Sequence, residues 1–202
     1  MSSSVVRSSR SNKDAIETNK TSLGFWIYLM TDCVLFASLF ATYAVLRNNT
    51  AGGPSGAELF DLNYVLIETL LLLTSSFTAG LAMLALKNKQ QAKVLLWLVV
   101  TFAFGLAFLL MEVYEFSVLY HEGHSWQTSG FLSAYFTLVG THGLHILIGL
   151  LWISVLAAQI MRVGLNASTA KRLTLFSLFW HFLDIVWIFI FTFVYLGGRI
   201  SL

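Results

Sequence analysis

Eight ionisable side chains lie inside, or at the ends of, strongly apolar stretches of this 202-residue chain. They are the acids Asp32, Glu68, Glu112, Glu115 and Asp184 and the histidines His142, His145 and His181. Such groups can exchange protons, ligate a metal ion or hold a haem iron. A charged side chain at the centre of a membrane helix costs ~2.5–3.5 kcal/mol, so each of these groups should face protein or water.

The buried acids have no lysine or arginine beside them in the sequence, because all twelve basic residues lie outside the apolar stretches or at their ends. A carboxyl group in that position either takes up a proton or accepts hydrogen bonds from histidine, tryptophan, tyrosine or threonine. Three pairs are spaced so that both members share one helical face. These pairs are Glu112 with Glu115, His142 with His145, and His181 with Asp184.

The elements that carry these groups must be membrane helices. Hydrophobic residues make up 57% of the chain and charged residues 11%, a balance that excludes a soluble domain. Five apolar runs each exceed the ~20 residues that cross a bilayer as a helix. They cover residues 24–46, 62–86, 94–119, 131–161 and 173–196. The sequence therefore predicts an all-α fold, a single five-helix membrane domain from residue 23 to 202.

Basic residues predict the orientation of this domain. Ten of the twelve fall in the polar segment 1–22, in 87–93 and in 162–172, whereas Arg47 and Arg199 alone fall on the alternate side. Positive residues remain inside, so we expect a cytoplasmic tail at residues 1–22 and a periplasmic C-terminus. Glu122 and His124 should lie outside. The net charge of +2 then reflects topology and does not indicate nucleic-acid binding.

This topology predicts two polar clusters at different depths in the membrane. Asp32, His181 and Asp184 fall in the cytoplasmic half, and we expect them to form or border a cluster that fixes the packing of the first and last helices. The outer half should contain Glu68, Glu112 and Glu115, closer to His142, while His145 lies nearer the middle. Helix adjacency does not follow from spacing.

Small and aromatic residues indicate contacts between helices and with the membrane surface. Ala37 with Ala41, Ser76 with Gly80, and Gly140 with Gly143 have the spacing that allows close helix approach. The aromatic residues near predicted span ends should form interfacial belts. They are Trp26, Tyr28, Tyr64, Tyr120, Trp126 and Tyr195.

Metal and haem binding have limited support in the sequence. A histidine from each of the last two spans, such as His145 with His181, could clamp a haem. A carboxylate-bridged metal site would favour repeated Glu-x-x-His, and the chain has no such motif. The alternative is structural: the histidines hydrogen-bond to carboxylates and backbone. Motifs for nucleophilic, phosphate or dinucleotide chemistry are missing from the connections, so we predict no catalytic, metal or cofactor-binding residue.

Four segments resemble, in order, subunit III of the haem-copper oxidases, most closely the branch of cytochrome o type ubiquinol oxidases. They are Gly24 to Cys33, Glu112 to Phe116, Gly140 to His145 and Trp180 to Trp187, and the resemblance extends over almost the whole chain beyond the tail. The chain departs from the mitochondrial type, which has seven helices, by lacking the first two. Asp32 stands where that type has a glutamate.

The resemblance implies an accessory subunit of a proton-pumping, quinol-oxidising complex in a bacterial inner membrane. Haem and copper then belong to subunit I, the main partner, with subunits II and IV in the same complex. Family members also hold phospholipid between their helices and help to sustain proton uptake and turnover.

Two other classes of protein stay open. A small proton channel or transporter would also place acids and histidines in its spans, although an internal repeat would be expected and none is evident. A haem-binding membrane protein is the second alternative.

Overall fold

The computed structural model describes residues 2–52, 61–123 and 126–197, with side chains from Lys20 onward. Two of the residues used for the topology prediction, His124 and Arg199, lie outside these ranges. Contacts divide the chain into two units, Met1–Ala37 and Ser38–Leu202.

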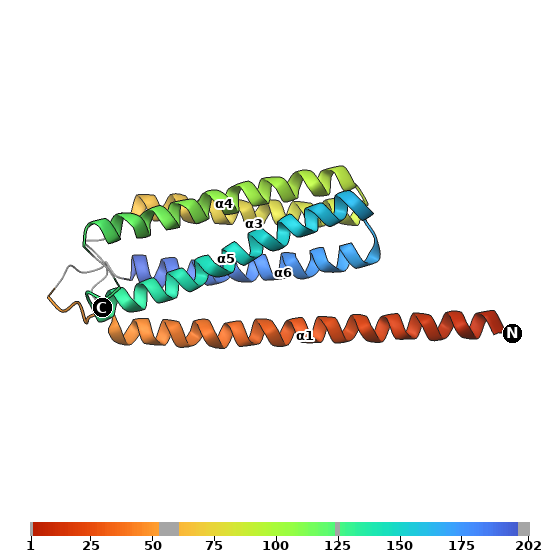
Figure 1. Cartoon of the computed structure of the whole chain (residues 1–202), viewed down its shortest axis with the longest axis horizontal. Coiled ribbons are helices and arrows are strands. Elements are labelled where there is room, and N and C mark those ends of the chain that lie inside the picture. Colours follow the sequence, from red (N-terminus) through yellow and green to blue (C-terminus); the bar gives the residue numbers. More distant parts are fainter. Residues whose placement is uncertain (1, 53–60, 124–125, 198–202) are drawn as a thin grey trace. The chain divides into compact units, whose positions relative to one another are not determined.

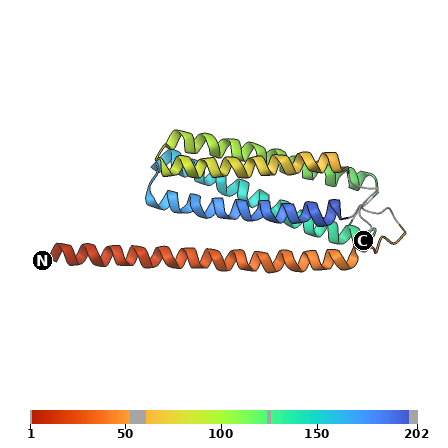
Figure 2. The same cartoon turned by 180° about the vertical axis from the view of Figure 1, so that it is seen from behind.

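Every described secondary-structure element is helical (Figures 1 and 2). Helix α1 covers Ser2–Leu46. It therefore includes the polar segment, from Ser2 to Ser22, as well as the first apolar run. It is followed by α3 (Leu62–Lys87), α4 (Gln91–His121), α5 (Gly130–Val163) and α6 (Ala167–Ile190). A short π-helix, η1 (Phe191–Leu196), extends α6 to the end of the last span.

The predicted five-helix membrane fold is confirmed. Within the described residues, five helices are long and apolar enough to cross a membrane: Lys20–Leu46, Leu62–Lys87, Gln91–His121, Gly130–Val163 and Ala167–Leu196. The orientation of the termini stays a prediction, as does the cytoplasmic location of the tail.

Polar caps explain why helices begin where they do. The side chain of Asp61 accepts a hydrogen bond from the Asn63 amide at 3.0 Å at the start of α3. Asn166 and Thr169 form a reciprocal capping box that starts α6 at Ala167, before the apolar run predicted from residue 173. Apolar composition detects the part of a helix that lies in lipid, and the cap sets where the helix itself begins.

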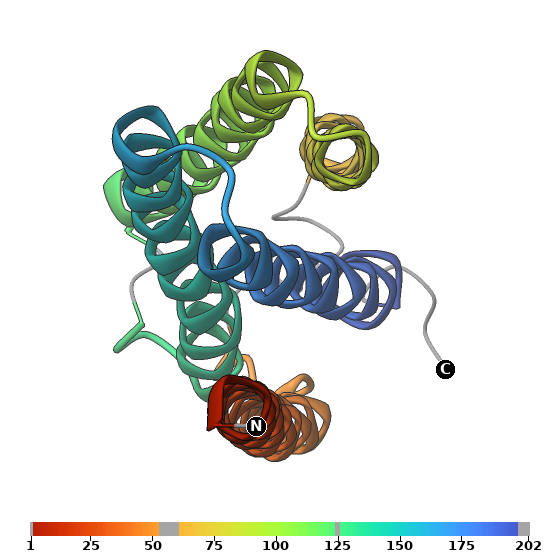
Figure 3. The same ribbon diagram turned by 90° about the vertical axis from the view of Figure 1, so that its right-hand side faces the viewer.

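Helices α3, α4, α5 and α6 form a closed arrangement in the second unit. Helix α4 packs on α3 and α5, and α6 packs on the same two helices, as the view along the bundle shows (Figure 3). The end of α1 that belongs to this unit is also attached: the Tyr43 ring lies 6.1 Å from the Phe131 ring, centroid to centroid.

Trp180 lies at the centre of the four helices and is 1% exposed. A Cβ atom on Gly105 of α4 would lie 2.8 Å from Trp180 Cζ2, and one on Gly149 of α5 would lie 2.6 Å from its Cζ3. The indole Nε1 donates to Ser75 Oγ of α3 at 2.7 Å. Because Gly105 and Gly149 have no side chains, the indole ring fits against α4 and α5, and its hydrogen bond reaches α3. Trp180 of α6 thus contacts the other three helices.

Candidate functional site

Three acids converge between α3 and α4, and we call Glu68, Glu112 and Glu115 the acidic cluster. Glu112 interacts electrostatically with both of the others. The helices are held in register here because Tyr64, one turn before Glu68, donates its hydroxyl to the Met111 carbonyl at 3.0 Å.

Two members of the acidic cluster are buried. Glu68 is 0% exposed and Glu112 is 2% exposed. Glu112 lies against α5, where a Cβ on Gly143 would be 2.9 Å from its carboxyl carbon. Both oxygens of Glu68 and Oε2 of Glu112 have no hydrogen-bond partner within the described part of the chain.

The third member, Glu115, is held by tyrosines. The Tyr195 hydroxyl of η1 donates to Glu115 Oε2 at 3.1 Å, and the Tyr135 hydroxyl of α5 lies 3.0 Å from that of Tyr195. Tyr135 also forms a hydrogen bond to Glu115. Two tyrosine hydroxyls from different helices therefore meet at this carboxylate.

His142 is 0% exposed and lies among aromatic rings. Its ring is stacked on Trp187, with centroids 5.3 Å apart, and meets Phe108 edge-on at 6.0 Å. The Trp187 indole in turn donates to Thr69 Oγ1 at 3.0 Å. His142 therefore packs in a core shared by α4, α5 and α6.

The other two histidines of the predicted spans, His145 and His181, each have a polar group within hydrogen-bond distance. His181 Nδ1 lies 2.8 Å from Ser76 Oγ, and Asp184 interacts with both Ser76 and His181. His145 Nδ1 lies 2.7 Å from the Thr141 carbonyl of its own helix. His181 and Asp184 thus form a polar group with α3.

Asp32 belongs to the first unit, where it interacts with the Tyr28 hydroxyl one turn earlier. His181 and Asp184 belong to the second unit. The cluster of these three residues across the first and last helices stays a prediction.

Tyr195 is not part of an interfacial belt, contrary to the sequence-based prediction. It is 1% exposed, whereas Trp26, Tyr120 and Trp126 are exposed as belt residues should be. Its hydroxyl reaches an acid, and its ring lies 6.2 Å from that of Trp187. The spacing could have indicated this position. Tyr195 follows Asp184 by about three turns of an α-helix, so the two residues should lie on the same face of the last helix.

Sequence reasoning also missed the partners of the buried groups. Tyr135, Ser75 and Trp180 were not predicted as parts of a polar network, and Gly105 and Gly149 were not among the expected close approaches. Of the glycines in the expected pairs, Gly143 meets Glu112, but a Cβ on Gly80 would contact nothing within 4 Å.

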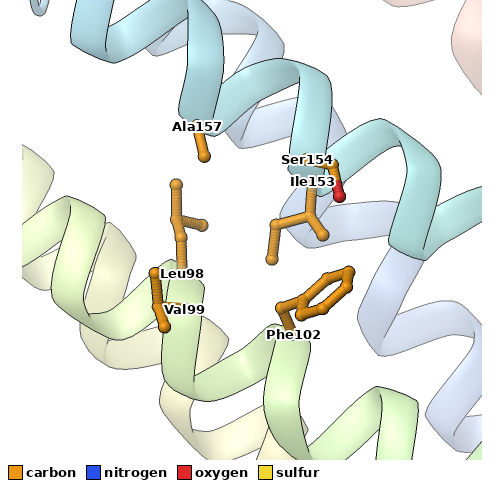
Figure 4. Close-up of a pocket in the computed structure, with 6 residues that line it drawn as sticks. All are labelled: Leu98, Val99, Phe102, Ile153, Ser154 and Ala157. Atoms are coloured by element: carbon orange, nitrogen blue, oxygen red, sulfur yellow. The ribbon is translucent and has the colours of Figure 1, made fainter.

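Pockets lie between these helices in the part of the chain that the structure describes. One, of about 180 Å³, lies between α4 and α5 and is almost wholly apolar (Figure 4). Its lining consists of Leu98, Val99, Phe102, Ile153, Ser154 and Ala157. Another, of about 240 Å³, lies where α3 begins and α4 ends, and Glu115 lines it together with Asp61 and Glu122.

Known proteins match nearly all of the chain. Residues 7–199 match the sequence model of the family described as cytochrome c oxidase subunit III. The chain is 57% identical over 178 residues to cytochrome bo(3) ubiquinol oxidase subunit 3 of Pseudomonas putida, covering 88% of this chain and 86% of that protein. It is 58% identical to the protein of the same name in Pseudomonas aeruginosa, over 89% and 86% of the two chains.

A relative from another branch matches as fully but at lower identity. Cytochrome c oxidase subunit 3 of Bacillus sp. (strain PS3) is 49% identical over 92% of this chain and 90% of its own length. These matches agree with the five apolar helices and with the four resembling segments. The chain therefore belongs to the cytochrome c oxidase subunit III family.

Proposed function

We propose that this chain is the accessory subunit III of a proton-pumping ubiquinol oxidase of the cytochrome o type in a bacterial inner membrane. The observation that carries the proposal is the 57–58% identity to two subunits named for bo(3) ubiquinol oxidases, over 86% of the length of each. The chain supports assembly and sustained turnover, and it takes no part in the redox chemistry.

Membership of the family supports the non-redox role, because this family is named as subunit III of an oxidase and haem and copper then belong to subunit I. The three span histidines have contacts within the bundle. Nδ1 of His181 lies near a serine hydroxyl, Nδ1 of His145 lies near a carbonyl of its own helix, and the His142 ring stacks on Trp187.

The membrane-facing surface supports roles in binding lipid and other subunits. The apolar pocket between α4 and α5 has one polar side chain, and the hydroxyl of that residue, Ser154, donates to the Leu150 carbonyl. Such a lining suits an acyl chain. A pocket of about 520 Å³ is lined by Lys89, Gln91, Asn166 and Ala167, so an ammonium group and the N-terminus of α4, which has no side-chain cap, are available to a phosphate. We infer that phospholipid binds the chain, whose main partner is subunit I, alongside subunits II and IV.

Deleting the chain from the complex tests this function. We expect the haem spectrum of the remaining subunits to be largely unchanged, while assembly, stability or quinol-dependent oxygen uptake over many turnovers falls. Unchanged assembly with unchanged prolonged uptake would refute the supporting role. Loss of haem from the depleted complex, together with haem binding by the purified chain, would instead favour a haem protein.

A further inference from the structure

Two carboxyl groups of the acidic cluster are buried, and within the described residues they lack most of the hydrogen bonds that would stabilise a negative charge. Glu68 and Glu112 are 0% and 2% exposed, and each interacts with other acids of the cluster. An ionised carboxylate in an apolar interior needs hydrogen bonds or a cation. Three of the four oxygens of this pair have no hydrogen-bond partner among the described residues.

A proton on each acid removes this difficulty. A neutral carboxylic acid has a much smaller cost of burial than a carboxylate, and it does not repel its neighbours. Gly143 also limits what else could enter, because the Glu112 carboxyl group occupies the space that a Cβ atom on α5 would take. The proton is the one ligand that needs no additional volume.

Glu115 has different surroundings from the other two acids. Its carboxyl group forms hydrogen bonds with the hydroxyls of Tyr195 and Tyr135, so its charged form has two donors. It is only partly buried, and it lines the pocket of about 240 Å³ that extends past Asp61 and Glu122 at the end of the helices. Glu115 is therefore placed between the water-accessible end of the bundle and the two buried acids.

We propose that the acidic cluster is a proton-holding site, in which Glu68 and Glu112 are neutral acids and Glu115 exchanges protons with water through the pocket beside it. The groups that face this site come from every helix around it. They are Asp61 and Tyr64 of α3 and its cap, Tyr114 and Glu122 of α4 and its cap, Tyr135 and His142 of α5, and Tyr195 of η1. The site goes beyond the accessory role proposed above and does not depend on it.

Infrared difference spectra of the purified complex test the proposal. Glu68→Gln and Glu112→Gln should each remove a protonated-carboxyl C=O band at neutral pH, and that band should shift in D₂O. In the wild type, acidification should increase a further band of this kind, and Glu115→Gln should abolish that increase. The matched control is Glu122→Gln, which removes a nearby exposed acid and should leave the protonated bands unchanged.

Several results would overturn the proposal. Loss of a carboxylate band in place of a protonated one in Glu68→Gln or Glu112→Gln would show that the acids are ionised. Displacement of the bands by added Na⁺ or Mg²⁺ would show a cation site. The glutamine variants should also co-purify with the complex in wild-type amounts, since a neutral amide replaces a neutral acid of the same size. Failure of both variants to assemble would therefore contradict the proposal as well.

Discussion

Gly143 and Gly80 lie within apolar helices but have opposite surroundings. A Cβ on Gly143 would be 2.9 Å from the Glu112 carboxyl carbon, whereas nothing lies within 4 Å of the same position on Gly80. We expect Gly143→Ala to destabilise the subunit by ~1–3 kcal/mol through overpacking, measured by thermal unfolding of the purified complex.

Gly80→Ala is the matched control for this prediction. Alanine is favoured over glycine inside a helix by ~0.5–1 kcal/mol, so this variant should be neutral or slightly stabilising. Equal destabilisation by both variants would show that Gly143 has no special role against Glu112.

Tyr195 and Tyr120 form a second matched pair, because one hydroxyl is buried and hydrogen-bonded and the other tyrosine is exposed. Tyr195 is 1% exposed and donates to Glu115, whereas Tyr120 is 66% exposed. Tyr195→Phe keeps the ring but removes this donor to Glu115 and the hydroxyl that lies 3.0 Å from that of Tyr135, so we expect a loss of ~1 kcal/mol in stability. Tyr120→Phe should change the unfolding midpoint very little. The prediction is wrong if the two variants unfold alike.

Helix α6 is joined to α3 by a hydrogen bond that can be measured on its own. Trp180 Nε1 donates to Ser75 Oγ at 2.7 Å in the buried centre of the bundle. A double-mutant cycle of Ser75→Ala and Trp180→Phe should give a coupling free energy of ~0.6 kcal/mol, the average for polar side chains between membrane helices.

The control for this cycle pairs Ser75→Ala with Trp152→Phe. Trp152 contacts Phe176 and Phe179 on the same α6 helix, at 5.8 and 5.7 Å between ring centroids. Additive effects are expected in that control cycle. Additive effects in the Ser75 and Trp180 cycle would mean that the hydrogen bond contributes no stability.

The sequence predicts that each helix exists more reliably than it predicts the residue at which the helix begins. Runs of twenty or more apolar residues have no alternative to helix in lipid, because unpaired backbone groups are too costly there. The start of α6 depends instead on Asn166 and Thr169, two polar residues outside the apolar run. A search for hydrophobic runs therefore detects the span and misses its cap.

The orientation of the whole molecule is the prediction that rests most directly on charge. The alternation of basic segments predicts that residues 87–93 lie in the cytoplasm and that the segment around Glu122 and His124 lies outside. Reporter fusions at Lys89 and at His124 should therefore report opposite compartments. Fusions that report the same compartment would exclude the five-span topology with this orientation.

Sequence by itself determined the class of this molecule, its five spans and its family, because each of these depends on local composition or on ordered short segments. Tertiary structure decided which groups meet. The sequence placed Glu68, Glu112 and Glu115 at a similar depth, but the tyrosines that reach Glu115, Tyr195 and Tyr135, come from other helices. Periodicity gives the face of a helix and hydropathy gives its depth, while the neighbour across that face depends on packing, as when Gly105 and Gly149 admit Trp180.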